Sequence, residues 1–241
     1  MFGERVAVLI PWIDGGTPEP NQVTSVDAMN QIGRLCGEFH RVASAYPVER
    51  RPKKAGSGRS LSEKRAALAW LLARHGRESE IGTELAIRLD LLSRSGHALE
   101  ASLWQAPDGM IHGDFHGAHA VFDGQRAVGV IDVLGEWYLP GWEMMRAFFQ
   151  SVPMTFGDDG YDALLKLWQG YLDGYRSAHS IRSGTDIEVA YDVYLFQLAT
   201  STYGLRPPLE TALRAFGRWR TEVARYLHDH RADLRTRMAS A

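Results

Sequence analysis

The sequence is short of lysine and has almost no cysteine. Of its 27 basic residues, only Lys53, Lys54, Lys64 and Lys166 are lysines. Cys36 is the single cysteine, so no internal disulfide can form, and a reducing compartment is expected. Its place in an apolar helical pattern predicts a small buried side chain rather than a nucleophile.

The sequence also lacks signals for membranes and nucleic acids. No stretch approaches the roughly 20 apolar residues that a membrane helix requires. Residues 1–5 do not begin the cationic run and apolar core of a secretory signal. A net charge of −2 produces no field that would draw the chain to nucleic acid or to an anionic membrane. We therefore expect a cytoplasmic protein with neither kind of partner.

Apolar residues recur at helical spacing over most of the chain, which predicts a mainly helical fold. The expected helices span about 24–46, 62–72, 78–103, 140–152, 159–178, 186–204 and 209–238. The third has a candidate break at Ser95-Gly96, and Trp70 is expected on the apolar face of the second. A short buried strand is expected at 6–10, ended by Pro11.

The residues that indicate chemistry lie in one central segment. Residues 111–119 read IHGDFHGAH and contain three of the nine histidines. Two short apolar runs follow around Asp123-Gly124, the dipeptide most typical of a β-hairpin turn. Because the second run ends at Asp132, the hairpin would return this carboxylate to the loop that carries Asp114. A kinase-type phosphotransferase uses two such carboxylates, one for the attacking hydroxyl and one for Mg²⁺ on the nucleotide phosphates.

This segment resembles a known family. The run from His112 to His116, the hairpin and Val130-Ile131-Asp132 are similar to the catalytic segment of the aminoglycoside phosphotransferase family. The family pattern is roughly His-Gly-Asp-x-His-x-x-Asn, a hairpin, Ile-Asp, a Pro-bearing loop and an acidic residue that opens an apolar helix. Residues 139–147, LPGWEMMRA, match the last part. The resemblance implies an α+β fold, mainly α with a small β-hairpin insert, like the C-terminal lobe of a protein kinase.

The resemblance also implies an activity and a set of site residues. The chain would transfer the γ-phosphoryl group of ATP or GTP to a hydroxyl of a small molecule, with Asp114 as the catalytic base. Asp132 would hold the metal together with His119, which stands where the family has Asn. Mg²⁺ prefers oxygen ligands and imidazole suits softer divalent cations, so Mn²⁺ is a second candidate. His112 and His116 would support the loop.

Further roles follow from the same resemblance. Glu143 would anchor the helix to the catalytic loop. The backbone of Ile10, Trp12 and Ile13 would hold the adenine as a hinge between two lobes. Acidic side chains near the C-terminal helices would receive a cationic substrate, with Asp158, Asp159, Asp162 and Glu188 as the candidates.

The family's N-terminal lobe is expected to be largely missing. The resemblance makes residues 1–15 a hinge-strand remnant of that lobe, and residues 16–241 the helical lobe with its catalytic loop and hairpin at 111–132. A complete member has a strand lysine paired with a helix glutamate, whereas no lysine here precedes Lys53. About ten residues precede the hinge, and a single strand takes about five. We therefore expect a truncated or inactive enzyme, or one whose missing lobe is supplied by a partner chain.

Two other functions stay open. His112, Asp114 and His116 alternate, so an extended segment would place them on one face. With His119 and Asp132 they would form the ligand set of a metal-dependent hydrolase, which tightly held Zn²⁺ would favour. The other alternative is a non-catalytic lobe that binds a small molecule or a partner, whose function would survive replacement of Asp114 by alanine.

Overall fold

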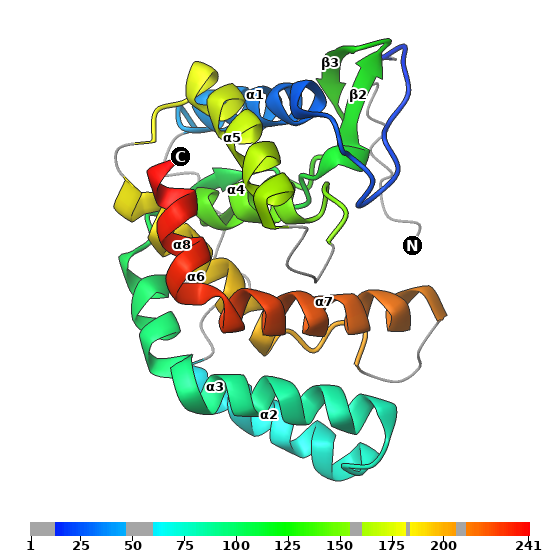
Figure 1. The fold of residues 1–241 in the computed structure, drawn as a ribbon, viewed down its shortest axis with the longest axis vertical. Coiled ribbons are helices and arrows are strands. Elements are labelled where there is room, and N and C mark those ends of the chain that lie inside the picture. The colour runs from blue at the N-terminus through cyan, green and yellow to red at the C-terminus, as the bar shows by residue number, and fades with distance from the viewer. Residues whose placement is uncertain (1–12, 47–59, 155–160, 182–183, 206–210) are drawn as a thin grey trace, which may run out of the picture.

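The computed structural model describes residues 13–46, 60–154, 161–181, 184–205 and 211–241 (Figure 1). Within these ranges the helices are α1 (Val26–Ala43), α2 (Leu61–His75), α3 (Glu80–Gln105), α4 (Pro140–Phe149), α5 (Tyr161–Ala178), α6 (Gly184–Thr200), α7 (Thr211–Asp229) and α8 (Arg231–Ser240), with a 3₁₀ turn, η2, at Gly117–His119. The strands are β1 (Gly109–Ile111), β2 (Ala120–Asp123), β3 (Arg126–Val130) and β4 (Glu136–Tyr138). This arrangement confirms the mainly α fold with a β-hairpin insert.

Several helices begin at side chains that satisfy otherwise unpaired backbone N–H groups. The hydroxyl of Ser25 accepts from the N–H of Ala28 at the start of α1. Ser60 and Glu63 cap α2 reciprocally, each side chain accepting from the other's backbone. Such caps typically stabilise a helix by about 1 kcal/mol. Helix α4 begins instead with Pro140, whose missing N–H costs nothing at a first helical position.

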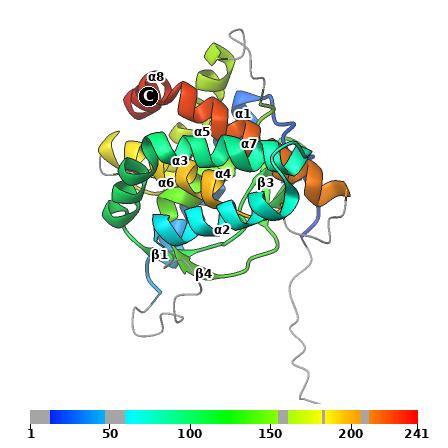
Figure 2. The same ribbon diagram turned by 90° about the horizontal axis from the view of Figure 1, so that it is seen from below.

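Helices α1 and α5 pack with their backbones in contact. A methyl group at Gly33 would collide with the carbonyl oxygen of Tyr171, and one at Gly174 with the carbonyl oxygen of Asn30. In Figure 1 these two helices and the β2–β3 hairpin form the upper part of the molecule, whereas α2, α3 and α7 form the lower part. Figure 2 shows the lower helices facing the viewer.

Helix α6 lies at the centre of the structure. It contacts α3, α4, α7 and α8, and it is buried around almost its whole circumference, as expected for a helix that is apolar on all sides. Phe149 of α4 stacks on Tyr194 of α6 with ring centroids 5.3 Å apart. This packing fixes α4, which carries part of the candidate site, against the core.

Some local predictions differ from the structure. The expected single helix at 209–238 is two helices, α7 and α8, which meet at His230, a residue outside helical geometry with φ −100° and ψ 10°. The candidate break at Ser95-Gly96 does not occur, because Gly96 instead makes room for the side chain of Leu61. Trp70 is 59% exposed rather than buried.

The hairpin is accompanied by a second short sheet that was not predicted. Strands β1 and β4 pair antiparallel, with Met110 opposite Trp137. In strands of three residues, the alternation of apolar and polar residues is too short to distinguish them from loops. The expected strand at 6–10 lies outside the described residues. None of the described helices has the length and apolarity needed to cross a membrane.

Candidate active site

The β2–β3 hairpin brings the two predicted carboxylates to the same place. Its turn residues are Gly124 and Gln125, one position later than the Asp-Gly pair suggested, because Asp123 still belongs to β2 and pairs with Arg126; Gly124 takes a φ of +58°. The hairpin closes at its base, where the N–H of Ile131 donates to the carbonyl of His119 at 3.0 Å. Asp132 follows, also at φ +58°, and its Oδ2 lies 3.6 Å from Nε2 of His119. The expected return of Asp132 to the catalytic loop is therefore present.

Asp114 lies in the loop between β1 and η2 and is held by an arginine. Its Oδ1 pairs with Nη2 of Arg146 from α4, and Nη1 of Arg146 donates to the carbonyl of Gly113 at 2.8 Å. Burial lowers the pKa of Arg146 to about 10, so the guanidinium remains charged at neutral pH. Sequence reasoning missed Arg146, although its position one turn after Glu143 on the predicted helix was the available signal.

Glu143 fixes the backbone just before Asp114. Its fully buried carboxylate accepts hydrogen bonds from the N–H groups of His112 at 2.8 Å and Gly113 at 2.6 Å. Nε2 of His40 lies 3.1 Å from Oε2 of Glu143. Burial by itself raises the pKa of this carboxyl, but the hydrogen bonds from His40 and from the two N–H groups outweigh burial and lower it. The ionised form is therefore the one that the site stabilises.

Three histidines pack together around the loop. Nδ1 of His119 lies 2.7 Å from the carbonyl of Asp114, and Nε2 of His112 lies 2.9 Å from the carbonyl of Ile131. The rings of His116 and His119 have centroids 4.0 Å apart. Burial and the two neighbouring histidines lower the pKa of His116 to about 4, and burial also lowers the pKa of His119. Neutral imidazoles are consequently favoured at neutral pH.

These side chains offer donors for a divalent cation. One ligand atom each from Asp114, His116 and His119 lies within 4.8 Å of the others. Nδ1 of His116 is buried and has no hydrogen-bond partner in the described part of the chain. A carboxylate with two neutral imidazoles suits Mn²⁺ or Zn²⁺ better than Mg²⁺. The sequence predicted His119 and Asp132 as the metal pair of a phosphotransferase, and Asp114 and His116 as further ligands of a hydrolase; the structure groups Asp114, His116 and His119.

A cavity of about 640 Å³ opens next to Asp114. Its aromatic lining consists of Trp142, Tyr194, Tyr203 and Phe216. Its charged lining consists of Asp114, Arg146 and Arg220. This volume falls in the range typical of small-molecule sites.

The acidic residues predicted to bind substrate do not line this cavity where the structure describes them. Asp162 pairs with Arg237 at 3.3 Å and Glu188 with Arg235 at 3.0 Å. Asp158 and Asp159 lie outside the described residues. The cavity next to Asp114 is thus walled by arginines and aromatic rings rather than by these carboxylates.

Only one residue of the predicted hinge is described. Ile13 packs on β3, where it occupies the space that a side chain at Gly129 would need. Three residues later, the backbone of Gly16 pairs with that of Phe122 on β2, at 2.9 and 2.7 Å. Ile10 and Trp12 lie outside the described residues.

Sequence comparison assigns the family. The sequence profile of a phosphotransferase enzyme family matches residues 1–179. The chain belongs to this family. No curated protein sequence matches the chain. The resemblance to the aminoglycoside phosphotransferases drawn from residues 112–147 is confirmed.

A solved structure confirms the protein-kinase-like fold of this phosphotransferase family member. It is similar to an aminoglycoside phosphotransferase from Alicyclobacillus acidocaldarius subsp. acidocaldarius DSM 446, with a TM-score of 0.63 and 13% identity over 95% of this chain and 71% of that one. It is also similar to a macrolide 2'-phosphotransferase, MphH, from Brachybacterium faecium, with a TM-score of 0.42 and 18% identity over 89% of this chain and 67% of that one. A third similar structure is the GDP complex of a variant of aminoglycoside 2'-phosphotransferase IIIa, with a TM-score of 0.44 and 16% identity over 85% of this chain and 61% of that one. The chain thus spans 61% to 71% of these proteins.

Proposed function

We propose that this protein transfers the γ-phosphoryl group of ATP or GTP to a hydroxyl group of a small molecule, with Asp114 as the base. The observation that carries the proposal is that Asp114 lies in the wall of the 640 Å³ cavity, on a loop whose backbone Glu143 holds. In the reaction the substrate oxygen bonds to the γ-phosphorus, and the bond from that phosphorus to the β–γ bridging oxygen breaks. The hydroxyl proton passes to Asp114, and the nucleoside diphosphate leaves.

Asp132 and His119 are the proposed metal ligands. A bound divalent cation would neutralise charge on the nucleotide phosphates. Asp132 is exposed and lies 3.6 Å from Nε2 of His119, so it is open to a ligand. The mixed oxygen and nitrogen donors favour Mn²⁺ over Mg²⁺.

The remaining contacts to the nucleotide would come from residues outside the described site. The hinge of Ile10, Trp12 and Ile13 is proposed to hold the base. Of the described lysines, neither Lys64 nor Lys166 lines the cavity next to Asp114. We propose that the lysine and glutamate of an N-terminal lobe come from outside the described residues, from a further segment of this protein or from a partner chain.

The experiment follows ADP or GDP formation with a panel of hydroxyl compounds, in the presence of Mg²⁺ or Mn²⁺. Asp114→Asn is expected to lower the substrate-dependent rate by about 10²- to 10⁴-fold, the usual contribution of a general base. Asp123→Asn, at the exposed last residue of β2, is the matched control and should leave the rate unchanged. Equal rates for Asp114→Asn and the unchanged protein would refute the role of Asp114. Absence of phosphoryl transfer with either nucleotide and either metal would favour a non-catalytic lobe that binds a small molecule or a partner.

One observation favours a second candidate, a metal-dependent hydrolase. The clustered ligand atoms of Asp114, His116 and His119 form a three-residue set of the kind that catalytic zinc uses. Metal analysis of the purified protein separates the two functions. Stoichiometric Zn²⁺ that survives dialysis would support the hydrolase, whereas a cation bound only together with nucleotide would support the phosphotransferase.

A further inference from the structure

The cavity next to Asp114 contains an arginine that the proposed transfer reaction does not use. Arg220 of α7 lines the cavity, and its side chain forms no ion pair in the described part of the chain. Its guanidinium lies over the ring of Phe216, 5.6 Å from the ring centroid. Its Nε is shielded from solvent and has no hydrogen-bond partner among the described residues. A buried donor without a partner is costly unless something else satisfies it.

A second polar group in the same wall is also unsatisfied. Tyr194 of α6 is 2% exposed, and its hydroxyl has no hydrogen-bond partner within the described residues. Its ring stacks on Phe149, which holds the side chain in place. Arg220 and Tyr194 therefore line one cavity from two different helices, and each has a buried donor without a partner among the described residues.

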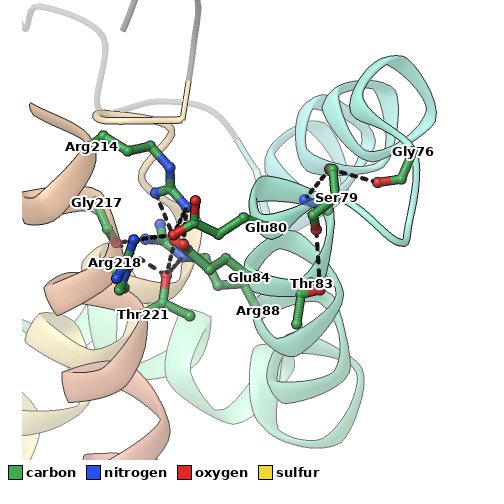
Figure 3. Close-up of polar contacts among 11 residues, drawn as sticks. Gly76, Ser79, Glu80, Thr83, Glu84, Arg88, Arg214, Gly217, Arg218 and Thr221 are labelled. Atoms are coloured by element: carbon green, nitrogen blue, oxygen red, sulfur yellow. Dashed lines mark hydrogen bonds and ion pairs between the residues drawn. The ribbon is translucent and has the colours of Figure 1, made fainter. Parts of the chain in front are cut away.

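Two acidic side chains of α3 that reach α7 have other partners. Glu84 of α3 pairs with Arg214 and accepts from the hydroxyl of Thr221 at 3.2 Å (Figure 3). Glu80 pairs with Arg218 and Arg214. No negative charge is left over on this side of the cavity among these residues.

A further positive charge lies behind the wall. Arg88 is fully buried, and its guanidinium donates to Thr221 Oγ1 at 2.9 Å and to the carbonyls of Leu198 and Gly217 at 3.1 and 2.9 Å. All of these acceptors are neutral, so its charge is not cancelled by contact with a carboxylate. Arg88, Arg214 and Arg218 outnumber Glu80 and Glu84 in this cluster, so the cluster carries an excess of positive charge.

The other arginine of the cavity lining, Arg146, is already in an ion pair. Arg146 forms an ion pair with Asp114 and donates a hydrogen bond to the carbonyl of Gly113. Its guanidinium also lies 5.3 Å from the ring centroid of Trp142. The cavity lining thus combines the proposed base Asp114, the ion-paired Arg146, an arginine without an ion pair, Arg220, and aromatic side chains.

We propose that the acceptor substrate is an anionic hydroxy compound, whose carboxylate or phosphate ester binds Arg220 and Tyr194 while its hydroxyl reaches Asp114. Its body would be apolar or aromatic, matching the rings of Trp142 and Phe216. This inference rests on the proposed phosphotransferase function for the role of the hydroxyl, but the anion site itself does not depend on phosphoryl transfer. It replaces the expectation of a cationic substrate.

The test is a binding measurement by calorimetry in the absence of nucleotide. The probes are 4-hydroxyphenylacetate, its neutral amide and the cation tyramine, which share a ring and a phenolic hydroxyl. We expect the anion to bind about tenfold tighter than the amide, as one charge-assisted contact provides, and tyramine to bind least. Arg220→Met should remove this preference, and Tyr194→Phe should reduce the affinity for the anion several-fold.

Arg218→Met is the matched control. It lies on the same helix, removes the same charge, and is exposed and paired with Glu80 rather than placed in the cavity. The preference for the anion should survive in this variant, and all variants should keep their thermal midpoints. No measurable binding of the anion, equal binding of the three probes, or tighter binding of tyramine would overturn the proposal.

Further outcomes distinguish a substrate anion from the nucleotide phosphates, and failure of the anion site from failure of the proposed phosphotransferase function. If Arg220→Met left the probe preference intact but weakened ATP binding, the arginine would serve the nucleotide phosphates, and the proposal would be wrong. Selective binding of the anion without any phosphoryl transfer would uphold the anion site and refute only the proposed function. Phosphoryl transfer to neutral or cationic acceptors alone would uphold the proposed function and refute the anion site.

Discussion

Arg146 holds Asp114 through an ion pair to Oδ1, while its other terminal nitrogen donates to the carbonyl of Gly113 at 2.8 Å. The two contacts fix the carboxylate relative to its own backbone. Because Arg146 is on α4, which packs on the central helix α6, the orientation of the proposed base is tied to the core of the protein.

Replacing Arg146 should therefore lower turnover more than stability. Arg146→Met keeps much of the side-chain length and removes both contacts, and we expect kcat to fall by about 10- to 100-fold, the effect of a misplaced reacting group. Arg146→Lys should recover part of the loss. Steady-state kinetics provide the measurement, and an unchanged kcat in Arg146→Met would show that the ion pair does not position the base.

Removing the charge of Glu143 should destabilise the fold. Glu143→Gln keeps the shape but loses charge-assisted hydrogen bonds from two backbone N–H groups, so we expect about 1.5–3 kcal/mol less free energy of unfolding. Denaturant unfolding measures this change. Glu38→Gln is the control, since Glu38 is in an exposed pair with Arg34, and should change the free energy by less than about 0.5 kcal/mol. Similar losses in both variants would contradict the structural role of Glu143.

The contact between α1 and α5 gives a second stability prediction. Gly174→Ala would place a methyl group against the carbonyl of Asn30. We expect a loss of about 1–3 kcal/mol, as for other overpacked positions. Gly16→Ala, where the added methyl group has nothing within 4 Å, is the comparison. Thermal and denaturant unfolding that failed to distinguish the two would mean that the helices can separate at no cost.

The histidine cluster predicts a loss of stability on acidification. The pKa of His116 is lowered from 6.5 to about 4, because burial and the neighbouring His119 and His112 disfavour its charged form. Between these pH values the unfolded chain binds more protons than the folded one, so stability falls as pH falls from 6.5 towards 4. Above 6.5 this contribution is constant.

The measurement for this prediction is the thermal midpoint against pH, in protein treated with a chelator. His116→Gln should flatten the curve between pH 6.5 and 4, the window set by the two pKa values. His97→Gln, at an exposed position of α3, should leave the curve unchanged. A curve for His116→Gln as steep as that of the unchanged protein would assign the acid sensitivity to other groups.

Much of the central segment could be predicted from sequence because its signals are local. An Asp-Gly pair between two apolar runs predicts a hairpin, and a hairpin of known length predicts that Asp132 returns to the loop of Asp114. The burial of Cys36 followed in the same way from helical periodicity and is present.

The features that sequence reasoning missed depend on contacts between distant elements. Arg220 enters the cavity only because α7 packs on α6, and Arg146 becomes a partner of Asp114 only because α4 lies beside the loop. Neither long-range contact leaves a periodic signal. The separation of α7 from α8 at His230 was missed for a related reason, since the amphipathic pattern runs on through a residue that is not helical.

Phosphoryl transfer to a hydroxyl, promoted by Asp114, can be followed by ³¹P NMR of a reaction with ATP and an acceptor. We expect a new phosphate monoester resonance that rises with ADP in the unchanged protein and in Asp123→Asn, and that is absent from Asp114→Asn over the same time. A resonance of inorganic phosphate alone, or an equal yield of the monoester from Asp114→Asn, would contradict the proposal.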